Sequence, residues 1–388
     1  MRHWHQGTIL GLALVAGFVA QSSAMQAANL PAPTMKMLAE LKLDPVILDG
    51  LDAELDVPKP WLDGAAKGDA VVVFGTWRDQ EFRRMAQSFN ARYPSVKLSY
   101  NRAGTAARGM KVIVALQEGR VLADVITSVA DSYLEFKNVA ALADLRELPG
   151  FKNLASEHVA ADGTWVSHKL SYRCLSYNTT LVKAEELPKT WDDLVNNPRW
   201  RGQKIALSDH PNAWLLALWS AKGEAWGQEF TRKLFALEPQ QRKEGMMALT
   251  GLTVAGEFQI QIPAPERRAE SYADKGAPIS YHCPEPAPIT LSQIVMLEKA
   301  KHKDGARLFI NWLLSREGQL VQYAASASIP VHKALLQPRF IPFADAIIGK
   351  PSIPRDEEML GSDLHKAMLK AWGTYWSGSR AGEPEESD

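Results

Sequence analysis

Between residues 70 and 128 the chain alternates strand patterns with helix patterns, and this alternation limits the possible folds more than any other feature. The first strand pattern, AVVVF, is a continuous apolar run typical of a strand buried on both faces. In chain order, the expected elements are a strand at 70–74, a helix that Pro94 ends, a strand at 96–100, a helix at 108–118 and a strand at 124–128. This βαβαβ order predicts a mainly parallel sheet with helices on its faces.

A second region of strands and helices begins near residue 175. Thr190 is expected to cap a helix, because its hydroxyl can accept a hydrogen bond from the first backbone N–H groups. Further expected elements are strands at 204–207, 258–262 and 277–281, and helices at 212–221, 306–315 and 363–376. The order indicates one α/β lobe that is interrupted by a second, after which the chain returns to the first.

Residues 1–24 have the layout of a secretory signal peptide. Arg2 precedes an apolar run of 13 residues at 8–20, and the small residues at 22–24 suit a signal peptidase. A membrane anchor is the less favoured alternative, because a spanning helix needs about 20 apolar residues. No cysteine lies near the expected cut after Ala24. We therefore expect secretion across the inner membrane into the periplasm, and not a lipoprotein.

The balanced charge argues against several classes of partner. Lys and Arg number 44, as do Asp and Glu, so the chain lacks the basic footprint of a nucleic-acid binder or of a membrane-binding patch. The sequence contains no GxSxG, HExxH, GxxxxGK[ST] or GxGxxG motif. We therefore expect no catalytic residue, no metal and no cofactor. An exported, hydrolase-like α/β enzyme with a scattered active site stays open as an alternative.

Four segments in this order follow the signal peptide: VVVFGTW with RYPSVKLSY, then DVITS, then YNTTLVKAEELPKTWDDLVNNPRWRGQKIALSD, then KDGARLFINWLLSREGQLVQYAASASIPVHK. Over about residues 70–333 the chain thereby resembles the extracellular solute-binding proteins of ABC importers, the family that contains the ferric-ion binders. The resemblance implies an α/β fold of two Rossmann-like lobes joined by two crossing hinge strands, with a ligand cleft between them (the type 2 periplasmic binding protein fold). It implies a monomer that delivers a small-molecule solute to permease subunits. A ligand-sensing receptor subunit would share this fold.

The resemblance also implies a division of the chain. After the signal peptide we expect an N-terminal extension with one helix near 34–41. Lobe I is expected to be made of two stretches, and the last segment to hold helices and an acidic tail. The expected bounds are 25–69 for the extension, 70–172 and 284–340 for lobe I, 173–283 for lobe II and 341–388 for the C-terminal segment.

Candidate ligand-binding residues follow from the expected sheets. In open parallel sheets, ligands bind beyond the carboxyl ends of strands, where loops lead into helix N-termini that favour anions. Four such loops are expected at 75–77, 103–108, 128–131 and 208–212, and Glu285 enters because YHCPEPAP matches the family's return crossing. The candidates are Thr76, Trp77, Thr105, Arg108, Ser128, Tyr172, Asp209, Asn212, Glu266, His282 and Glu285.

Each candidate has a plainer alternative. Thr76, Ser128 and Asp209 could only cap helices. Trp77 could pack in the core, although its place directly after a strand favours the cleft. A lone histidine such as His210 or His282 is more often structural than ligand-binding. Three other tryptophans lie on apolar helix faces and are expected in the core: Trp214, Trp219 and Trp312.

One departure from the family concerns iron. The ferric-ion binders place two adjacent tyrosines after a strand of the second lobe, because phenolate oxygens suit Fe(III). Here FQIQI is followed by Pro263-Ala264-Pro265-Glu266. We therefore do not expect a ferric-ion binder.

The two cysteines, Cys174 and Cys283, are far apart in sequence. An even number of cysteines in an exported protein favours a disulfide, and no metal-binding CxxC spacing is present. The resemblance places one cysteine where the chain leaves lobe I and the other where it returns. Because the family's two crossings run side by side, we predict a Cys174–Cys283 disulfide. Two buried free thiols are the alternative.

Overall fold

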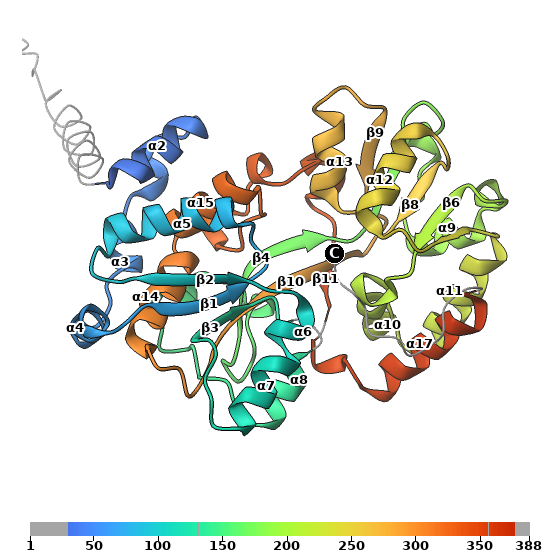
Figure 1. Ribbon diagram of the computed structural model, residues 1–388. Coiled ribbons are helices and arrows are strands. Elements are labelled where there is room, and N and C mark those ends of the chain that lie inside the picture. Colours follow the sequence, from blue (N-terminus) through green and yellow to red (C-terminus); the bar gives the residue numbers. More distant parts are fainter. Residues whose placement is uncertain (1–29, 130–131, 356, 377–388) are drawn as a thin grey trace, which may run out of the picture.

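The structure is a computed structural model that describes residues 30–129, 132–355 and 357–376. Two lobes lie side by side, each built on its own β-sheet (Figure 1). The prediction of a two-lobed α/β protein is therefore confirmed. The expected signal peptide and acidic tail lie outside the described residues. No helix in the described ranges combines the length and the apolar character needed to cross a bilayer.

Lobe I contains a six-stranded mixed sheet. Its strands are β1 (Val71–Gly75), β2 (Leu98–Arg102), β3 (Val125–Thr127), β4 (Val166–Tyr172), β10 (Ala287–Met296) and β11 (Ser352–Pro354). The strand order is β11-β10-β3-β1-β2, and β4 pairs with β10. β1 is parallel to β2 and β3, as the βαβαβ pattern predicts. β10 runs antiparallel to β3 and β4, so the returning chain completes this sheet.

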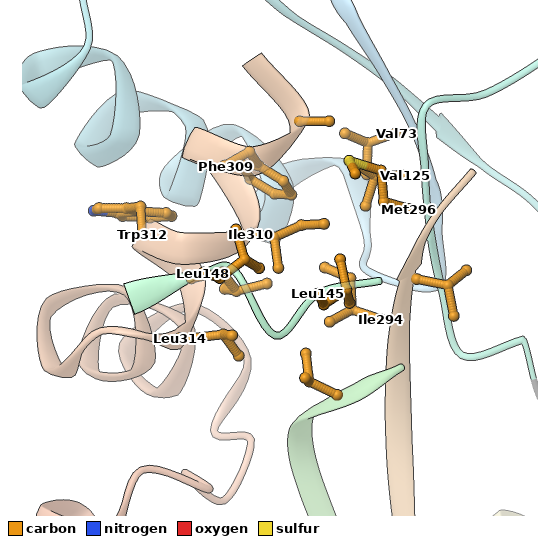
Figure 2. Packing of buried hydrophobic residues seen from close by; sticks show 14 of the residues in the cluster. Val73, Val125, Leu145, Leu148, Ile294, Met296, Phe309, Ile310, Trp312 and Leu314 are labelled. Atoms are coloured by element: carbon orange, nitrogen blue, oxygen red, sulfur yellow. The ribbon is translucent and has the colours of Figure 1, made fainter. Parts of the chain in front are cut away.

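The core of lobe I lies between the sheet and its helices. Phe309 and Ile310 lie near Val73, Val125 and Met296 of the strands (Figure 2). All five side chains are at most 1% exposed, which explains the apolar face expected on this helix. The lobe I helices are α5 (Asp79–Arg92), α6 (Thr105–Arg108), α7 (Met110–Gln117), α8 (Tyr133–Asn138), α14 (Lys303–Leu314) and α15 (Arg316–Ser326).

Lobe II has a five-stranded sheet in the order β7-β6-β8-β5-β9. Its strands are β5 (Leu175–Asn178), β6 (Ile205–Ser208), β7 (Gln240–Arg242), β8 (Ile260–Ile262) and β9 (Ile279–His282). Its helices are α9 (Trp191–Asn196), α10 (Leu215–Lys222), α11 (Glu224–Ala236), α12 (Met246–Ala255) and α13 (Glu266–Ala273). Thr190 Oγ1 accepts a hydrogen bond from Asp193 N, which confirms the predicted cap. Trp214 and Trp219 are fully buried here, and Trp312 is fully buried in lobe I, as expected.

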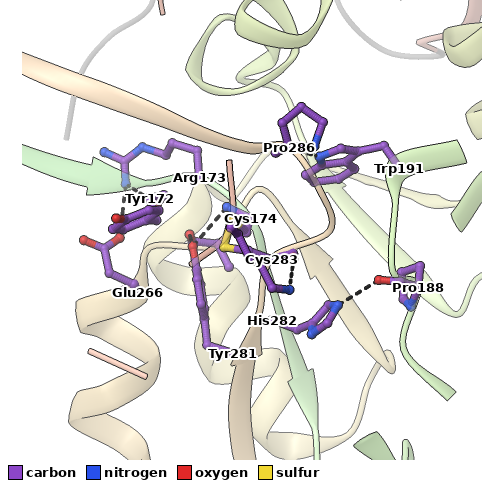
Figure 3. Close-up of a disulfide and its surroundings, with 12 residues drawn as sticks. Tyr172, Arg173, Cys174, Pro188, Trp191, Glu266, Tyr281, His282, Cys283 and Pro286 are labelled. Atoms are coloured by element: carbon purple, nitrogen blue, oxygen red, sulfur yellow. Dashed lines mark hydrogen bonds and ion pairs between the residues drawn. A yellow bond between two sulfur atoms is a disulfide. The ribbon is translucent and has the colours of Figure 1, made fainter. Parts of the chain in front are cut away.

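Two crossings join the lobes. β4 leads into β5 through Arg173 and Cys174, and β9 leads into β10 through residues 283–286. β4 pairs with β10 in lobe I and β5 pairs with β9 in lobe II, so the crossings run side by side. A disulfide joins Cys174 to Cys283, whose Cα atoms are 4.9 Å apart (Figure 3). The predicted bond is therefore confirmed.

The described part of the N-terminal segment packs on lobe I. It contains α2 (Ala32–Glu40), α3 (Leu51–Glu54) and α4 (Lys59–Lys67), of which the sequence predicted only the first. The fully buried Glu317 accepts hydrogen bonds from Thr34 Oγ1 (2.5 Å), Arg92 Nε (2.7 Å) and Trp312 Nε1 (2.9 Å). This buried carboxylate thus ties α2 to α5 and α15.

The C-terminal segment makes a third passage between the lobes. After α16 (Ala344–Ile347), β11 joins the lobe I sheet beside β10. The chain then crosses to lobe II, where α17 (Asp363–Tyr375) packs on α10 and α11 and buries Met368 and Trp372 (Figure 1). The last elements of the described chain therefore complete both lobes.

Candidate ligand-binding site

Strand β4 presents two polar side chains on the face that is turned away from the lobe I core. Successive residues of a strand point to opposite faces. His168 and Leu170 are buried, at 0% and 4% exposure, whereas Lys169 and Ser171 are both partly exposed. Lys169 and Ser171 therefore share the face that is open to solvent.

Charged groups from both lobes surround Lys169. Burial is the main cause that lowers the pKa of Lys169. The carboxylates of Glu81 and Glu266 act in the opposite direction and raise this pKa. The guanidinium groups of Arg173 and Arg108 lower it further. Within the described part of the chain, Lys169 Nζ has no hydrogen-bond acceptor and no carboxylate at ion-pair distance. A partly desolvated ammonium group without a partner is costly, and an anion would compensate it.

Arg108 is one of the cations that act on Lys169, and it belongs to lobe I; these charged residues (Lys169, Arg108, Arg173 and Glu266) are called the cluster below. Its side chain is almost fully buried, and burial lowers the pKa of Arg108. The guanidinium donates to Ser128 O from Nε (3.2 Å) and Nη2 (3.1 Å), and also to Ala103 O. Ser128 has a left-handed backbone (φ 55°) and contributes this carbonyl. The two loops expected after β2 and β3 are thus held together by Arg108.

Glu266 brings lobe II to the same place. It is the first residue of α13 and is 2% exposed. Its Oε2 is buried without a hydrogen bond and lies 3.8 Å from Arg173 Nη1, too far for one. Arg173 Nε is also buried without a hydrogen bond. Tyr172 lies beside this pair (Figure 3), and burial, followed by the charge of Glu266, raises the pKa of Tyr172 to about 12.

Trp77 lies in the core and not in the cleft. Its side chain is 2% exposed and its ring contacts Phe82, Tyr100 and His168, at a centroid distance of 5.0 Å for His168. The preference for the cleft was therefore wrong: the ring packs against nearby Phe82 and against Tyr100 and His168, which are distant in sequence.

The buried His168 is held by Gln322. Gln322 Nε2 donates to His168 O, so Gln322 Oε1 accepts from His168 Nδ1 at 2.7 Å. This leaves His168 Nε2 as a buried acceptor without a partner. Burial is the main reason why the pKa of His168 falls to about 3.

Other candidates are engaged elsewhere. Asp209 Oδ1 lies 2.8 Å from His210 Nδ1, although neither atom makes a hydrogen bond. Asn212 Oδ1 lies 2.9 Å from His365 Nε2 of α17. His282 Nε2 donates to Pro188 O at 2.7 Å, the structural role that a lone histidine favours.

The remaining candidates lie at the edges of the cluster or away from it. Glu285 is exposed at the return crossing, where its N–H donates to Lys189 O. Thr76 is partly exposed and does not cap α5, whose N-cap is Arg78. The backbone of Thr105 begins α6, and its side chain is outside the described structure.

Lys169, Ser171 and Arg173 were not predicted because site residues were expected only on loops. Their signal was present: in VSHKLSYR, apart from His168, polar and apolar residues alternate, which is typical of a half-buried strand.

No group of three or more His, Cys, Asp and Glu side chains in the described ranges could hold a metal ion. The donors of the cluster are mainly cationic, which suits an anion.

The family model described as bacterial extracellular solute-binding protein matches residues 76–320, more than half of the chain. The chain belongs to this family. As an extracellular solute-binding protein it binds a small solute and is not an enzyme. The hydrolase alternative is thereby set aside.

Solved structures with the same fold agree. This solute-binding protein aligns with a Trichodesmium protein in complex with iron and citrate (TM-score 0.67, 16% identity, 80% of this chain and 100% of that one). It aligns with the Actinobacillus pleuropneumoniae periplasmic binding protein AfuA with bound fructose-6-phosphate (TM-score 0.60, 19%, 80% and 99%). It also aligns with the substrate-binding protein of an Agrobacterium tumefaciens ABC transporter (TM-score 0.59, 15%, 78% and 96%). At these identities the likeness shows the fold.

In sequence, this solute-binding protein is 28% identical over 160 residues to an uncharacterized protein of Haemophilus influenzae. The alignment covers 38% of this chain and 43% of that protein, less than half of each.

Proposed function

We propose that this protein is the periplasmic substrate-binding component of an ABC importer and captures a small organic anion between its lobes. The observation that carries the proposal is Lys169, whose ammonium group has no partner in the described structure and is within electrostatic range of Arg108 and Arg173. An anionic group placed there would supply the missing charge.

The ligands named for structural neighbours support an organic anion. The Trichodesmium structure holds citrate with iron, and the AfuA structure holds fructose-6-phosphate. Both organic molecules are anionic near neutral pH. The family description as extracellular and the disulfide both favour the periplasm, because disulfides persist in oxidising compartments.

The proposal does not include a ferric ion. The segment after β8 places Pro263, Ala264 and Pro265 before Glu266, where the ferric-ion binders have adjacent tyrosines. The carboxylate of Glu266 faces Arg173, and such a cation would repel Fe(III).

Domain closure fits the geometry. Arg108 and Lys169 belong to lobe I, Glu266 to lobe II, and Arg173 to the crossing between them. A solute that contacts all of them binds best when the lobes close, and its binding stabilises the folded protein by linkage.

The proposal is tested with the solute that co-purifies from cell envelopes, detected by native mass spectrometry and then removed and titrated back by calorimetry. We expect an anion, and Lys169→Met should weaken its binding about tenfold to a hundredfold, the range for a charge-assisted hydrogen bond. Lys275→Met removes an exposed lysine of lobe II and is the matched control. A neutral or cationic solute, or equal affinities for the two variants, would contradict the proposal.

A further inference from the structure

Arg173 and Glu266 leave one donor and one acceptor unused beside each other. Arg173 Nε is a buried donor without a hydrogen bond, and Glu266 Oε2 is a buried acceptor without one. Nε belongs to the same guanidinium as Nη1, which is 3.8 Å from Oε2. The open donor and the open acceptor therefore belong to neighbouring side chains. Buried polar atoms are nearly always satisfied, so this pair requires an explanation.

The two atoms differ in what they demand from a partner. A group that serves both must accept a hydrogen bond from Nε and donate one to Oε2. A hydroxyl group does both. An ammonium group has no acceptor and would face the Arg173 cation, and a second carboxylate or phosphate has no proton to give to Glu266.

The anion position and this pair lie within electrostatic range of each other. The charges of Arg173 and Glu266 both act on Lys169, as does that of Arg108. A solute that spans these groups can pair its anionic group with Lys169 and present other atoms to Arg173 and Glu266.

We infer that the solute is a hydroxylated organic anion, with a hydroxyl group that bridges Arg173 Nε and Glu266 Oε2 while its anionic group pairs with Lys169. This inference rests on the proposed function and adds the class of substrate. Lys169 and Arg108 select the charge, and Glu266 selects the hydroxyl. A carboxylate and a phosphate share the chemistry needed at Lys169, so sugar acids and sugar phosphates are the two sources to compare.

The test measures binding of matched probes to the full mature protein by calorimetry and thermal shift. Gluconate is compared with hexanoate, glucose 6-phosphate with hexyl phosphate, and glucitol serves as the neutral polyol. We expect at least one hydroxylated anion to bind about tenfold or more tightly than its hydroxyl-free counterpart, since a site that hydrogen-bonds a hydroxyl rejects analogues that lack it. Glucitol should not bind.

Variants of Glu266 test whether this residue causes the preference for hydroxylated anions. Glu266→Gln keeps the side-chain shape but loses the charged acceptor, so it should weaken the hydroxylated anion about tenfold and leave the hydroxyl-free anion unchanged. The exposed Glu185→Gln in the short helix η5 (Ala184–Glu186) should change neither. Glu266→Met, which removes both oxygens at similar length, checks that the effect comes from the acceptor.

The outcomes separate the two proposals. Three outcomes would show that the inferred substrate class is wrong. Hydroxyl-free anions could bind as tightly as hydroxylated ones, Glu266→Gln could weaken binding of the two kinds of anion equally, or neither hydroxylated anion could bind. In that case, loss of a bound anion in Lys169→Met would still support the proposed function. If glucitol binds, or if Lys169→Met leaves every bound anion unaffected, the proposed anion site itself is wrong.

Discussion

At the residue scale, the proposed site combines Lys169 and Arg108 of lobe I with Glu266 of lobe II. Arg108 and Glu266 were predicted because loops after strands and helix starts are common binding positions. Lys169 could not be placed among them without knowing that β4 borders both lobes. Trp77 was assigned to the cleft because its core partners Tyr100 and His168 are brought to it only by the tertiary fold.

His168 makes a prediction about acid stability. In the folded protein burial holds its pKa at about 3, against 6.5 for an exposed histidine. Between these values the unfolded chain binds a proton that the folded protein does not, so stability is lost as the pH falls below 6.5. At pH 5 this loss amounts to about 2 kcal/mol for the single group.

His168→Asn keeps a donor for Gln322 but cannot be protonated. We expect the free energy of unfolding, measured in urea at pH 7 and at pH 5, to fall by about 2 kcal/mol less in the variant than in the wild type. The variant's stability at pH 7 corrects for the smaller side chain. An identical fall in both proteins would show that His168 is protonated in the folded state.

At the scale of elements, regular patterns were predictable and pairings were not. The βαβαβ unit and the helix at 306–315 follow from periodicity, and α5, α14 and the strands β1 to β3 form there. β4 alternates polar and apolar residues but was not assigned, because nothing local shows that it pairs with β10, more than a hundred residues later. The short helices α3 and α4 form because Leu51 and Trp61 are buried against lobe I.

The disulfide between the crossings should stabilise the fold strongly. The bond joins residues that are 109 positions apart, and closing a loop of this length restricts the unfolded chain. Replacing both Cys174 and Cys283 with Ala should lower the free energy of unfolding by about 2–5 kcal/mol. Denaturant unfolding without reductant, compared with the oxidised wild type, measures this difference. Equal midpoints, or two titratable thiols in the unfolded wild type, would contradict it.

At the scale of the whole molecule, the two lobes share their final segment. The sequence predicted helices at the C-terminus but not their destination, since burial of Trp372 against lobe II depends on the third passage. β11 extends the sheet of lobe I and α17 covers lobe II. The two lobes therefore depend on one stretch of chain for their completion.

A truncation tests this dependence. A chain that ends at Gly349 loses β11 from lobe I and loses Met368 and Trp372 from the core of lobe II. We expect a lower thermal midpoint, with hydrogen exchange increased in both sheets, because each lost buried side chain costs about 2–5 kcal/mol. A chain that ends at Trp376 keeps every described element and is the control. Faster exchange confined to lobe II would contradict a shared role.

The same third passage determines when the two lobes can finish folding during synthesis. During synthesis, β10 emerges only after all of lobe II, and α17 emerges last of the described helices. Neither domain can therefore reach its native packing on a partly made polypeptide, and the non-local contacts that both require form slowly. A nascent chain that lacks its end is therefore less stable than the finished protein. For a member of an extracellular family, a chain that gains its full stability late is easier to pass unfolded through a secretion channel.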